Sequence, residues 1–493
     1  HVTRDSGKTW KNVTPKDMPT LAYVGCIEIS QQNADTIYVS ATRYKLGDYS
    51  PYLFLSKNGG KSWSSIVGDL DSNEIVRVVR ADPHCEGLLF IGTETGLFYS
   101  QNDGKNWRRM KGAFPTVPVY DIKIKNSDLV VATHGRSFWI LDDFSPLREI
   151  KPTQNKIQIF TPKDTVRTRL AWSAGSSFTK EGINYGPAFG IGGASEMTVL
   201  SNGKKVRRYL DVGENPPNGA LIHYFLPTDF AGEFELSIFD SKDKLVKAYK
   251  VGKNNAVSNN SPTATTGLNR FVWNLKHQGP TTLDASLDER KNKPLAQKSD
   301  EIEGPTVAPG RYAVVLQSNG TSIQTHFNVL MDPRLKIAKN ALEKQLALLQ
   351  KLYAALSNLN VAVNQMRQVK RRLLEIEKNL TPKHATLKTR SSSILEKLKQ
   401  IEISLIDPKR ESHRDVLRHS GGLSDSLTDL ISLVSIGDEA PTSQAIAVSQ
   451  EVIDKVNEKI ASLESILKKD LISFRATLMK SDLTTLESNL LLV

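Results

Sequence analysis

The sequence has few residues suited to covalent or metal chemistry. Its 493 residues include two cysteines, Cys26 and Cys85, and nine histidines without the paired spacing typical of a zinc site. It also lacks a phosphate-binding glycine loop, a nucleophile elbow and a paired-cysteine zinc motif. We therefore expect neither a metal nor a cofactor. The two cysteines could pair or remain free, so they do not identify a cellular compartment.

Long apolar runs are also missing, and no stretch approaches the length of a transmembrane helix. The hydrophobic content of 39% and the charged content of 24% are typical of ordinary globular domains. A chain of this length is expected to form two to four domains. It opens at His1 without an apolar leader, so a signal peptide, if the protein has one, lies outside this sequence.

The charge balance is basic, with a formal net charge of +12. The lysines are spread along the chain and form no stripe interleaved with aromatic residues, so we expect no nucleic-acid partner. A solvated basic surface explains the excess, and attraction to acidic glycans or to a negatively charged cell surface is the alternative.

One short motif occurs three times, at residues Thr3–Trp10, Ser56–Trp63 and Ser100–Trp107. Each copy has a hydroxyl residue first, Asp or Asn third, Gly fifth, Lys sixth and Trp last. The tryptophans are 53 and 44 residues apart, a period typical of propeller blades. The pattern predicts a hairpin in which the Asp or Asn caps its own backbone and the Gly takes a positive φ. The predicted structural residues are Asp5, Gly7, Trp10, Asn58, Gly60, Trp63, Asn102, Gly104 and Trp107.

Short alternating runs around these motifs predict four-stranded blades up to about residue 145. The expected strands are 24–29, 36–40, 52–55, 75–80, 87–91, 96–100, 119–124, 129–133 and 137–141. Roughly three blades cannot close a propeller, which usually needs at least four. We therefore expect further blades upstream in the natural protein.

The rest of the chain changes character twice. Residues 148–332 keep a strand pattern without the repeat and predict a β-sandwich, with mobile loops at 254–266 and 288–303. Residues 333–493 show apolar stripes at helical spacing and predict an antiparallel helical bundle, with helices near 342–376, 384–405, 423–434 and 442–478. The expected fold is therefore a partial propeller at 1–147, an Ig-like sandwich and a bundle.

The three motifs are Asp boxes, and with further strings they resemble one family: the large extracytoplasmic BNR/Asp-box proteins of bacteria, similar to the sortilin/VPS10 propeller. The matching strings are 46–52, 76–83, 92–98, 130–143 and 213–220. The resemblance implies that this chain is the C-terminal part of such a protein. Strings at 267–275 and 309–312 resemble the Ig-like module of flagellar-hook-capping proteins. Members are often labelled glycosyl hydrolase, but a fold analogy does not establish a reaction.

Arg77, Arg80 and Glu94 of the second blade are the first candidate ligand-binding residues. A sialidase-like site would join arginines to acids and a tyrosine nucleophile. Other residues of these types nearby are Arg43, Asp48, Asp82, Tyr44 and Tyr49. No spacing ties them into one site, so we favour structural ion pairs between blades for Arg77 and Arg80, with Glu94 among the possible partners.

His134 and Arg136 flank Gly135 and form the second candidate. A glycine allows close backbone approach, and the two side chains could offer donors to an anion. The favoured interpretation is a tight turn between strands whose His and Arg hydrogen-bond within the blade.

The sequence thus favours a non-catalytic, extracytoplasmic binding or assembly protein whose propeller engages a protein, peptide or glycan. A glycoside hydrolase with its active site mainly in upstream blades is the alternative. A structural component of a larger cell-surface assembly is the third hypothesis.

Overall fold

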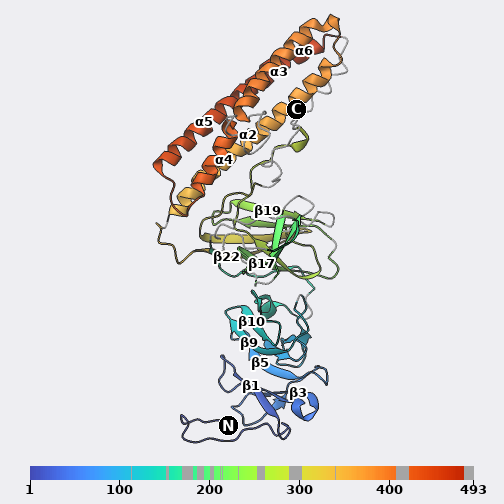
Figure 1. The fold of residues 1–493 in the computed structure, drawn as a ribbon, viewed down its shortest axis with the longest axis vertical. Coiled ribbons are helices and arrows are strands. Elements are labelled where there is room, and N and C mark those ends of the chain that lie inside the picture. The colour runs from blue at the N-terminus through green and yellow to red at the C-terminus, as the bar shows by residue number, and fades with distance from the viewer. Residues whose placement is uncertain are drawn as a thin grey trace. The chain divides into compact units, whose positions relative to one another are not determined.

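The computed structural model describes residues 1–112, 114–151, 155–168, 181–185, 194–199, 205–210, 213, 215–230, 232–252, 261–287, 302–338, 340–406 and 421–481. The chain divides into two compact units. The first comprises residues 1–160, 223–230 and 266–268, and the second comprises 161–222, 231–265 and 269–493. The predicted mixture of β structure followed by C-terminal helices is confirmed (Figure 1).

The first unit begins with three antiparallel sheets in succession along the described residues. The first sheet has the order β1 (Tyr23–Ile29), β2 (Ile37–Arg43), β3 (Asp48–Ser56) and β4 (Ser64–Ser65). The second has the order β5 (Val76–Ala81), β6 (Leu89–Thr93), β7 (Leu97–Ser100) and β8 (Arg108–Arg109). The third has the order β11 (Phe138–Leu141), β10 (Asp128–Thr133) and β9 (Val119–Lys125). Each expected strand of this region is present, with ends that differ by a few residues.

The second sheet lies between two hydrophobic cores, and an irregularity in β5 between Val76 and Val78 puts these two side chains in different cores. Val76 and Val79 join the core shared with the first sheet, which also contains Tyr38 and Leu53. Val78 joins the core shared with the third sheet. The two faces of β5 therefore connect the first sheet to the third.

The three copies of the repeated motif, called boxes below, form the same local structure. The first-position hydroxyl accepts the glycine N–H at 2.8, 2.9 and 2.9 Å in turn. The Asp or Asn side chain accepts the N–H four residues later at 2.8, 2.9 and 3.0 Å. Each glycine and the residue before it have positive φ, as a type I′ turn requires. In the first box, hydrogen bonds from the side chain and the backbone of Thr9 hold the pKa of Asp5 near 2.

The box tryptophans also join consecutive repeats. Trp63 Nε1 donates to Val13 O at 2.6 Å, and Trp107 Nε1 donates to Ile66 O at 3.0 Å. Each acceptor lies three residues after the tryptophan of the preceding box. Trp10 instead donates to Gly7 O of its own turn at 3.1 Å, and its side chain is 61% exposed. The indole is therefore a link between repeats in the second and third boxes.

We predict that Trp107→Phe lowers the free energy of unfolding by about 1–3 kcal/mol, because the buried Ile66 carbonyl loses its donor. Trp10→Phe is the matched control and should change stability much less, since its indole bonds within an exposed turn. Differential scanning calorimetry of both variants tests this. Equal destabilisation by the two substitutions would contradict the proposed link.

The segment that follows the third sheet forms an ion pair and hydrogen bonds with residues of the second sheet and its loops. The short helix α1 (Pro146–Glu149) carries Arg148, which forms a forked ion pair with the buried Asp82 at 2.9–3.2 Å. Gln101 donates to the Leu147 and Ile150 carbonyls at 2.7 Å. Cys26 and Cys85 are both free.

The second unit contains most of the remaining strands. A five-stranded sheet has the order β13 (Thr165–Arg167), β22 (Thr321–Met331), β21 (Gly310–Ser318), β18 (Phe234–Phe239) and β19 (Leu245–Val251). Asn319 and Gly320 both have positive φ between β21 and β22, which is the two-residue hairpin turn that an Asn-Gly pair favours. A further sheet, β14 (Gly182–Tyr185), β15 (Ala194–Val199) and β16 (Lys205–Tyr209), was not predicted from the sequence.

Two strands have residues in both units: β17 (Ala220–Leu226) and β20 (Gly267–Trp273). Within the first unit, β12 (Gln158–Ile159) pairs antiparallel with Tyr224 and Phe225 of β17. Of the two segments expected to be mobile loops, residues 254–260 and 288–301 lie outside the described residues.

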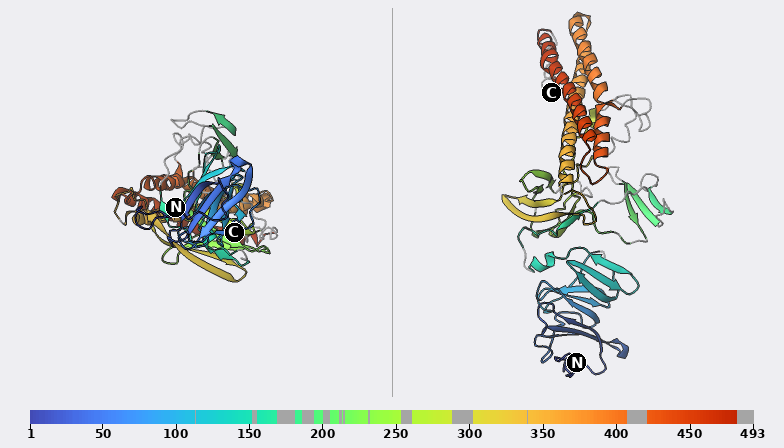
Figure 2. Two further views of the ribbon diagram at one scale, coloured as in Figure 1. Left: turned by 90° about the horizontal axis from the view of Figure 1, so that it is seen from below. Right: turned by 90° about the vertical axis from the view of Figure 1, so that its left-hand side faces the viewer.

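The helices of the second unit agree closely with the expected ranges. They are α2 (Ala341–Glu377), α3 (Ala385–Leu405), α4 (Gly422–Val434) and α5 (Ser443–Ser465). Thr442 caps α5 by accepting the Ala445 N–H at 3.1 Å. A π-helical segment, Ile466–Leu471, separates α5 from α6 (Ile472–Leu478), where the sequence predicted one continuous helix. These helices run alongside one another (Figure 2).

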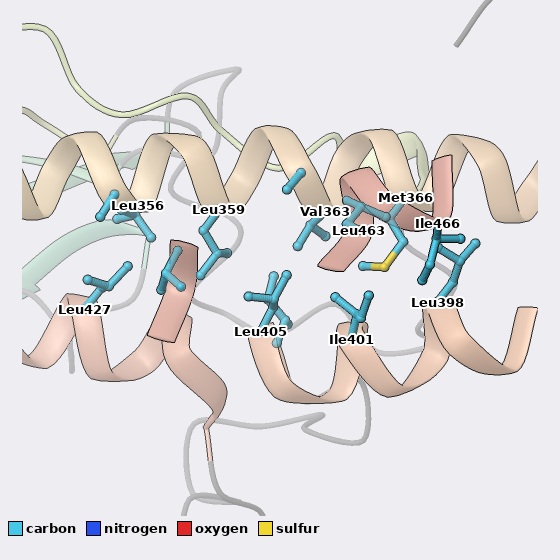
Figure 3. Close-up of a cluster of buried hydrophobic side chains, with 14 of the residues drawn as sticks. Leu356, Leu359, Val363, Met366, Leu398, Ile401, Leu405, Leu427, Leu463 and Ile466 are labelled. Carbon is cyan, nitrogen blue, oxygen red and sulfur yellow. The ribbon is translucent and has the colours of Figure 1, made fainter. Parts of the chain in front are cut away.

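The apolar stripe of α2 forms the centre of the helical core. Figure 3 shows Leu356, Leu359, Val363 and Met366 facing side chains from the other helices, including Leu405. By length and composition alone, α2 could cross a membrane, but half of its most apolar window is buried. A core helix satisfies the same criteria, so the stripe is explained by packing.

A buried ion pair interrupts this core. Arg367 Nε of α2 donates to Glu402 Oε1 of α3 at 2.9 Å, and both side chains are more than 90% buried. Lys370 Nζ lies 3.9 Å from the other carboxylate oxygen. Pairs of this kind contribute little net stability but are costly to break, because an unpaired buried charge remains.

We predict that Arg367→Met destabilises the protein by about 3–5 kcal/mol, whereas the double variant Arg367→Met/Glu402→Leu recovers most of that loss. Urea unfolding followed by circular dichroism at the helical signal measures both variants. A double variant as unstable as the single one would show that the pair contributes more than mutual neutralisation.

Candidate functional site

Charged side chains gather on β1, β5 and β9, each of which is an edge strand of one of the three sheets of the first unit. β1 and β9 both pack against β5. Arg80 of β5 pairs with Glu28 of β1 at 3.3 Å and with Asp121 of β9 at 2.6 Å, and its Nε donates to Ile122 O at 2.8 Å. Its side chain is largely buried. Arg80 therefore connects the three sheets, and all of these contacts are with the protein itself.

The electrostatics of this network follow from its burial. Burial raises the pKa of Glu28, and the positive charge of Arg80 opposes the shift. For Arg80, burial alone would lower the pKa, but nearby groups including Glu28 raise it above the ordinary value. The arginine thus stays charged and its partners remain bound to it.

Arg77, on the same strand, lies between two tyrosines. Its guanidinium carbon is 4.9 Å from the centre of the Tyr44 ring and 4.5 Å from that of Tyr120, which are cation–π distances. Its Nε donates to Glu94 Oε2 at 2.5 Å, and its Nη2 pairs with the same oxygen. The expected ion pair with Glu94 is therefore present. Burial alone would lower the pKa of Arg77, but Glu94 raises it above the ordinary value.

A pocket of about 350 Å³ opens beside Arg77. Its described lining consists of Leu21, Tyr23, Gly25, Thr42, Arg43, Tyr44, Lys45, Leu46, Arg77 and Tyr120. The lining combines aromatic and aliphatic side chains with three basic groups, and none of the described lining residues is an acid. Ligand sites are commonly concave and combine apolar side chains with a few placed polar groups, and in this pocket polar and apolar surface are about equal. This volume suits a small group or one to two side chains of a partner.

A second ion pair lies at the edge of the pocket. Arg43 Nη1 is 3.2 Å from Asp48 Oδ2, and Tyr52 Oη donates to the same oxygen at 2.7 Å. The hydrogen bond from Tyr52 is the main cause that lowers the pKa of Asp48. Burial raises the pKa of Tyr52, and Asp48 raises it further. This tyrosine is therefore held in its protonated form.

The second candidate pair from the sequence is only partly connected to this pocket. The exposed His134 ring stacks on Tyr120 with centroids 5.1 Å apart. Arg136 lies in the turn after Thr133, where its N–H donates to Thr133 Oγ1 and its carbonyl accepts from Trp139 Nε1. Neither residue is among the described residues that line the pocket.

Several residues of the pocket were not selected as ligand-binding candidates from the sequence. Tyr120, Lys45 and Leu21 lie in three separate segments, and only the packing of β1, β5 and β9 brings those segments together. The tyrosines flanking Arg77 are 33 residues before it and 43 after it, so no local spacing marks them. Among the described residues, no group of three or more His, Cys, Asp or Glu side chains could hold a metal ion.

No family model and no curated protein match the sequence. Among solved structures, YCF48 bound to D1 peptide is 18% identical, with a TM-score of 0.21, over 31% of this chain and 44% of that chain. PorZ, a surface component of the type-IX secretion system of Porphyromonas gingivalis, is 14% identical, with a TM-score of 0.21, over 62% and 39%. An ancestral GH74 enzyme is 12% identical, with a TM-score of 0.18, over 62% and 43%.

The chain spans less than half of the length of each of these three structures. Their TM-scores are too low to support an inference about the fold or the function of this chain.

We predict that Gly25→Ala distorts the pocket, because a Cβ at this position would lie 2.7 Å from the Arg77 carbonyl oxygen. The added methyl must push β1 away from β5, at a cost of about 1–3 kcal/mol. Gly437→Ala is the control, since a Cβ there meets nothing within 4 Å. Thermal melting compares the two variants, and an unchanged melting temperature for Gly25→Ala would refute the close approach.

Proposed function

We propose that this chain belongs to an extracytoplasmic, non-catalytic binding or assembly protein. In this proposal the three sheets of residues 1–147 are propeller blades carrying Asp boxes, as in BNR and sortilin-like proteins. Residues 148–332 include an Ig-like sandwich, and residues 333–493 form a helical bundle that mediates assembly. The pocket beside Arg77 engages a protein, peptide or glycan partner.

The observation that carries this proposal is the state of the charged groups at the pocket. Arg77 is occupied by Glu94, and Arg43 is occupied by Asp48. A hydrolase of the sialidase type needs arginines free to bind a substrate carboxylate, together with an acid that can reach the substrate. Because both arginines already hold carboxylates of the chain and no described lining residue is an acid, the site is better suited to binding than to hydrolysis.

One contact favours the alternative, a glycoside hydrolase. Tyr52 donates to Asp48, and Arg43 lies beside them, an arrangement of the type used by a tyrosine nucleophile with a carboxylate partner. The pKa of Tyr52 is raised, which is opposite to the shift that activates a nucleophile. The hydrolase alternative therefore requires that substrate binding changes the contacts among Tyr52, Asp48 and Arg43 so that Tyr52 becomes a nucleophile.

A hydrolase site that includes Tyr52 of this chain is tested by assaying the chain with 4-methylumbelliferyl N-acetylneuraminide and 4-methylumbelliferyl β-glucoside. We expect no release of fluorophore above the rate in buffer, and no difference between the wild-type protein and Tyr52→Phe. A rate well above buffer that Tyr52→Phe abolishes would overturn the non-catalytic proposal. Binding to an array of surface glycans, measured with the same two proteins, serves as the parallel test for a glycan partner.

A further inference from the structure

Large apolar side chains are exposed around the same pocket. The exposed fractions are 78% for Leu21, 71% for Tyr23, 54% for Leu46 and 48% for Tyr120. A single exposed leucine is ordinary, but contiguous apolar groups at the rim of a pocket mark an interaction site. The rim therefore offers a partner apolar surface to bury, beyond the polar contacts of the pocket floor.

Leu21 is held in a conformation that does not suit it. Its φ is +64°, and the Ala22 N–H donates to Pro19 O at 3.2 Å, which places Leu21 third in a four-residue turn. That position favours Gly or Asn when φ is positive, because other side chains are strained there. Strain of this kind is concentrated at sites that bind ligands. Since its side chain is mostly exposed, packing within the chain does not explain a leucine at this position.

Lys45 provides a positive charge at the pocket. It lies in the short helical turn Tyr44–Leu46 between β2 and β3, and it is exposed. The other two basic residues of the lining are occupied by Glu94 and Asp48. Among the described ion pairs, none includes Lys45. The pocket thus presents one available positive charge next to an apolar rim.

We infer that this pocket binds a peptide segment in which a bulky apolar residue lies next to an aspartate or glutamate. The apolar side chain packs against Leu21, Tyr23 and Tyr120, and the carboxylate pairs with Lys45. This inference rests on the proposed binding function and narrows its partner to an acidic peptide. Leu21 and Leu46 of the rim favour an apolar peptide side chain over a sugar, because they offer no hydrogen-bonding partner to its hydroxyl groups.

A random heptapeptide library displayed on phage tests this inference with the full chain. We expect the wild-type protein to enrich peptides that carry Asp or Glu beside Leu, Ile, Phe, Tyr or Trp. Lys45→Glu should instead enrich Lys or Arg at the acidic position. Lys61→Glu, the same charge change at an exposed lysine of the second box, should select the same peptides as the wild type.

The best selected peptide is then measured by fluorescence anisotropy. Lys45→Glu should weaken its binding at least tenfold, and a peptide with lysine in place of the acid should regain affinity for this variant. Leu21→Asn should weaken binding severalfold while it raises the melting temperature, because asparagine tolerates the positive φ. A leucine with a purely structural role would lower the melting temperature when replaced and leave binding unchanged.

These experiments distinguish failure of the peptide-binding inference from failure of the proposed non-catalytic function. Peptides without an acidic bias, no enrichment at all, or equal effects of Lys45→Glu and Lys61→Glu would overturn the inference. Glycan binding without peptide binding would also overturn it, but would leave the non-catalytic function standing. Turnover of a glycoside that depends on Tyr52 would overturn both.

Discussion

The first unit depends on a single guanidinium group. Arg80 projects from β5 and reaches carboxylates on β1 and β9, as well as the backbone of β9. A planar, permanently charged guanidinium has five donors on three nitrogens and can satisfy partners on two sides at once, whereas a lysine has three donors on one nitrogen. Because these contacts hold β1, β5 and β9 together, they also set where Arg77, on the same strand as Arg80, meets Tyr44 and Tyr120.

The boxes and the pocket illustrate two uses of local backbone geometry. In each box, positive φ falls on the glycine and on the residue before it, and the hairpin is stabilised by its own hydrogen bonds. At the pocket rim, a positive φ falls on Leu21, which does not suit it. The first pattern serves the fold alone. The second is consistent with a rim that is shaped for a partner.

The charged candidate residues show which contacts could be predicted from the sequence and which could not. Arg77 was expected to pair with an acid between blades, with Glu94 among the possible partners; it does pair with Glu94, but that pair lies within one sheet and its loops. Arg80 was expected to pair with acids between blades, and its partners are Glu28 and Asp121, 52 and 41 residues away. His134 and Arg136 are neighbours in sequence, but only His134 stacks on a pocket residue. Two side chains from one turn can have different surroundings. They cannot be assigned to one site before the positions of the surrounding strands are known.

The sequence by itself determined the local elements. Strand alternation, the box turns, the Asn319–Gly320 hairpin and the apolar stripes of α2 to α5 all follow from backbone preferences and burial over a few residues. Only the tertiary structure decided which distant groups meet. The Val13 and Ile66 carbonyls accept hydrogen bonds from tryptophans of the following repeat. Two tyrosine rings flank Arg77, and Glu402 pairs with Arg367. These contacts join residues dozens of positions apart. They depend on which strands and helices pack together, and no local preference encodes that choice.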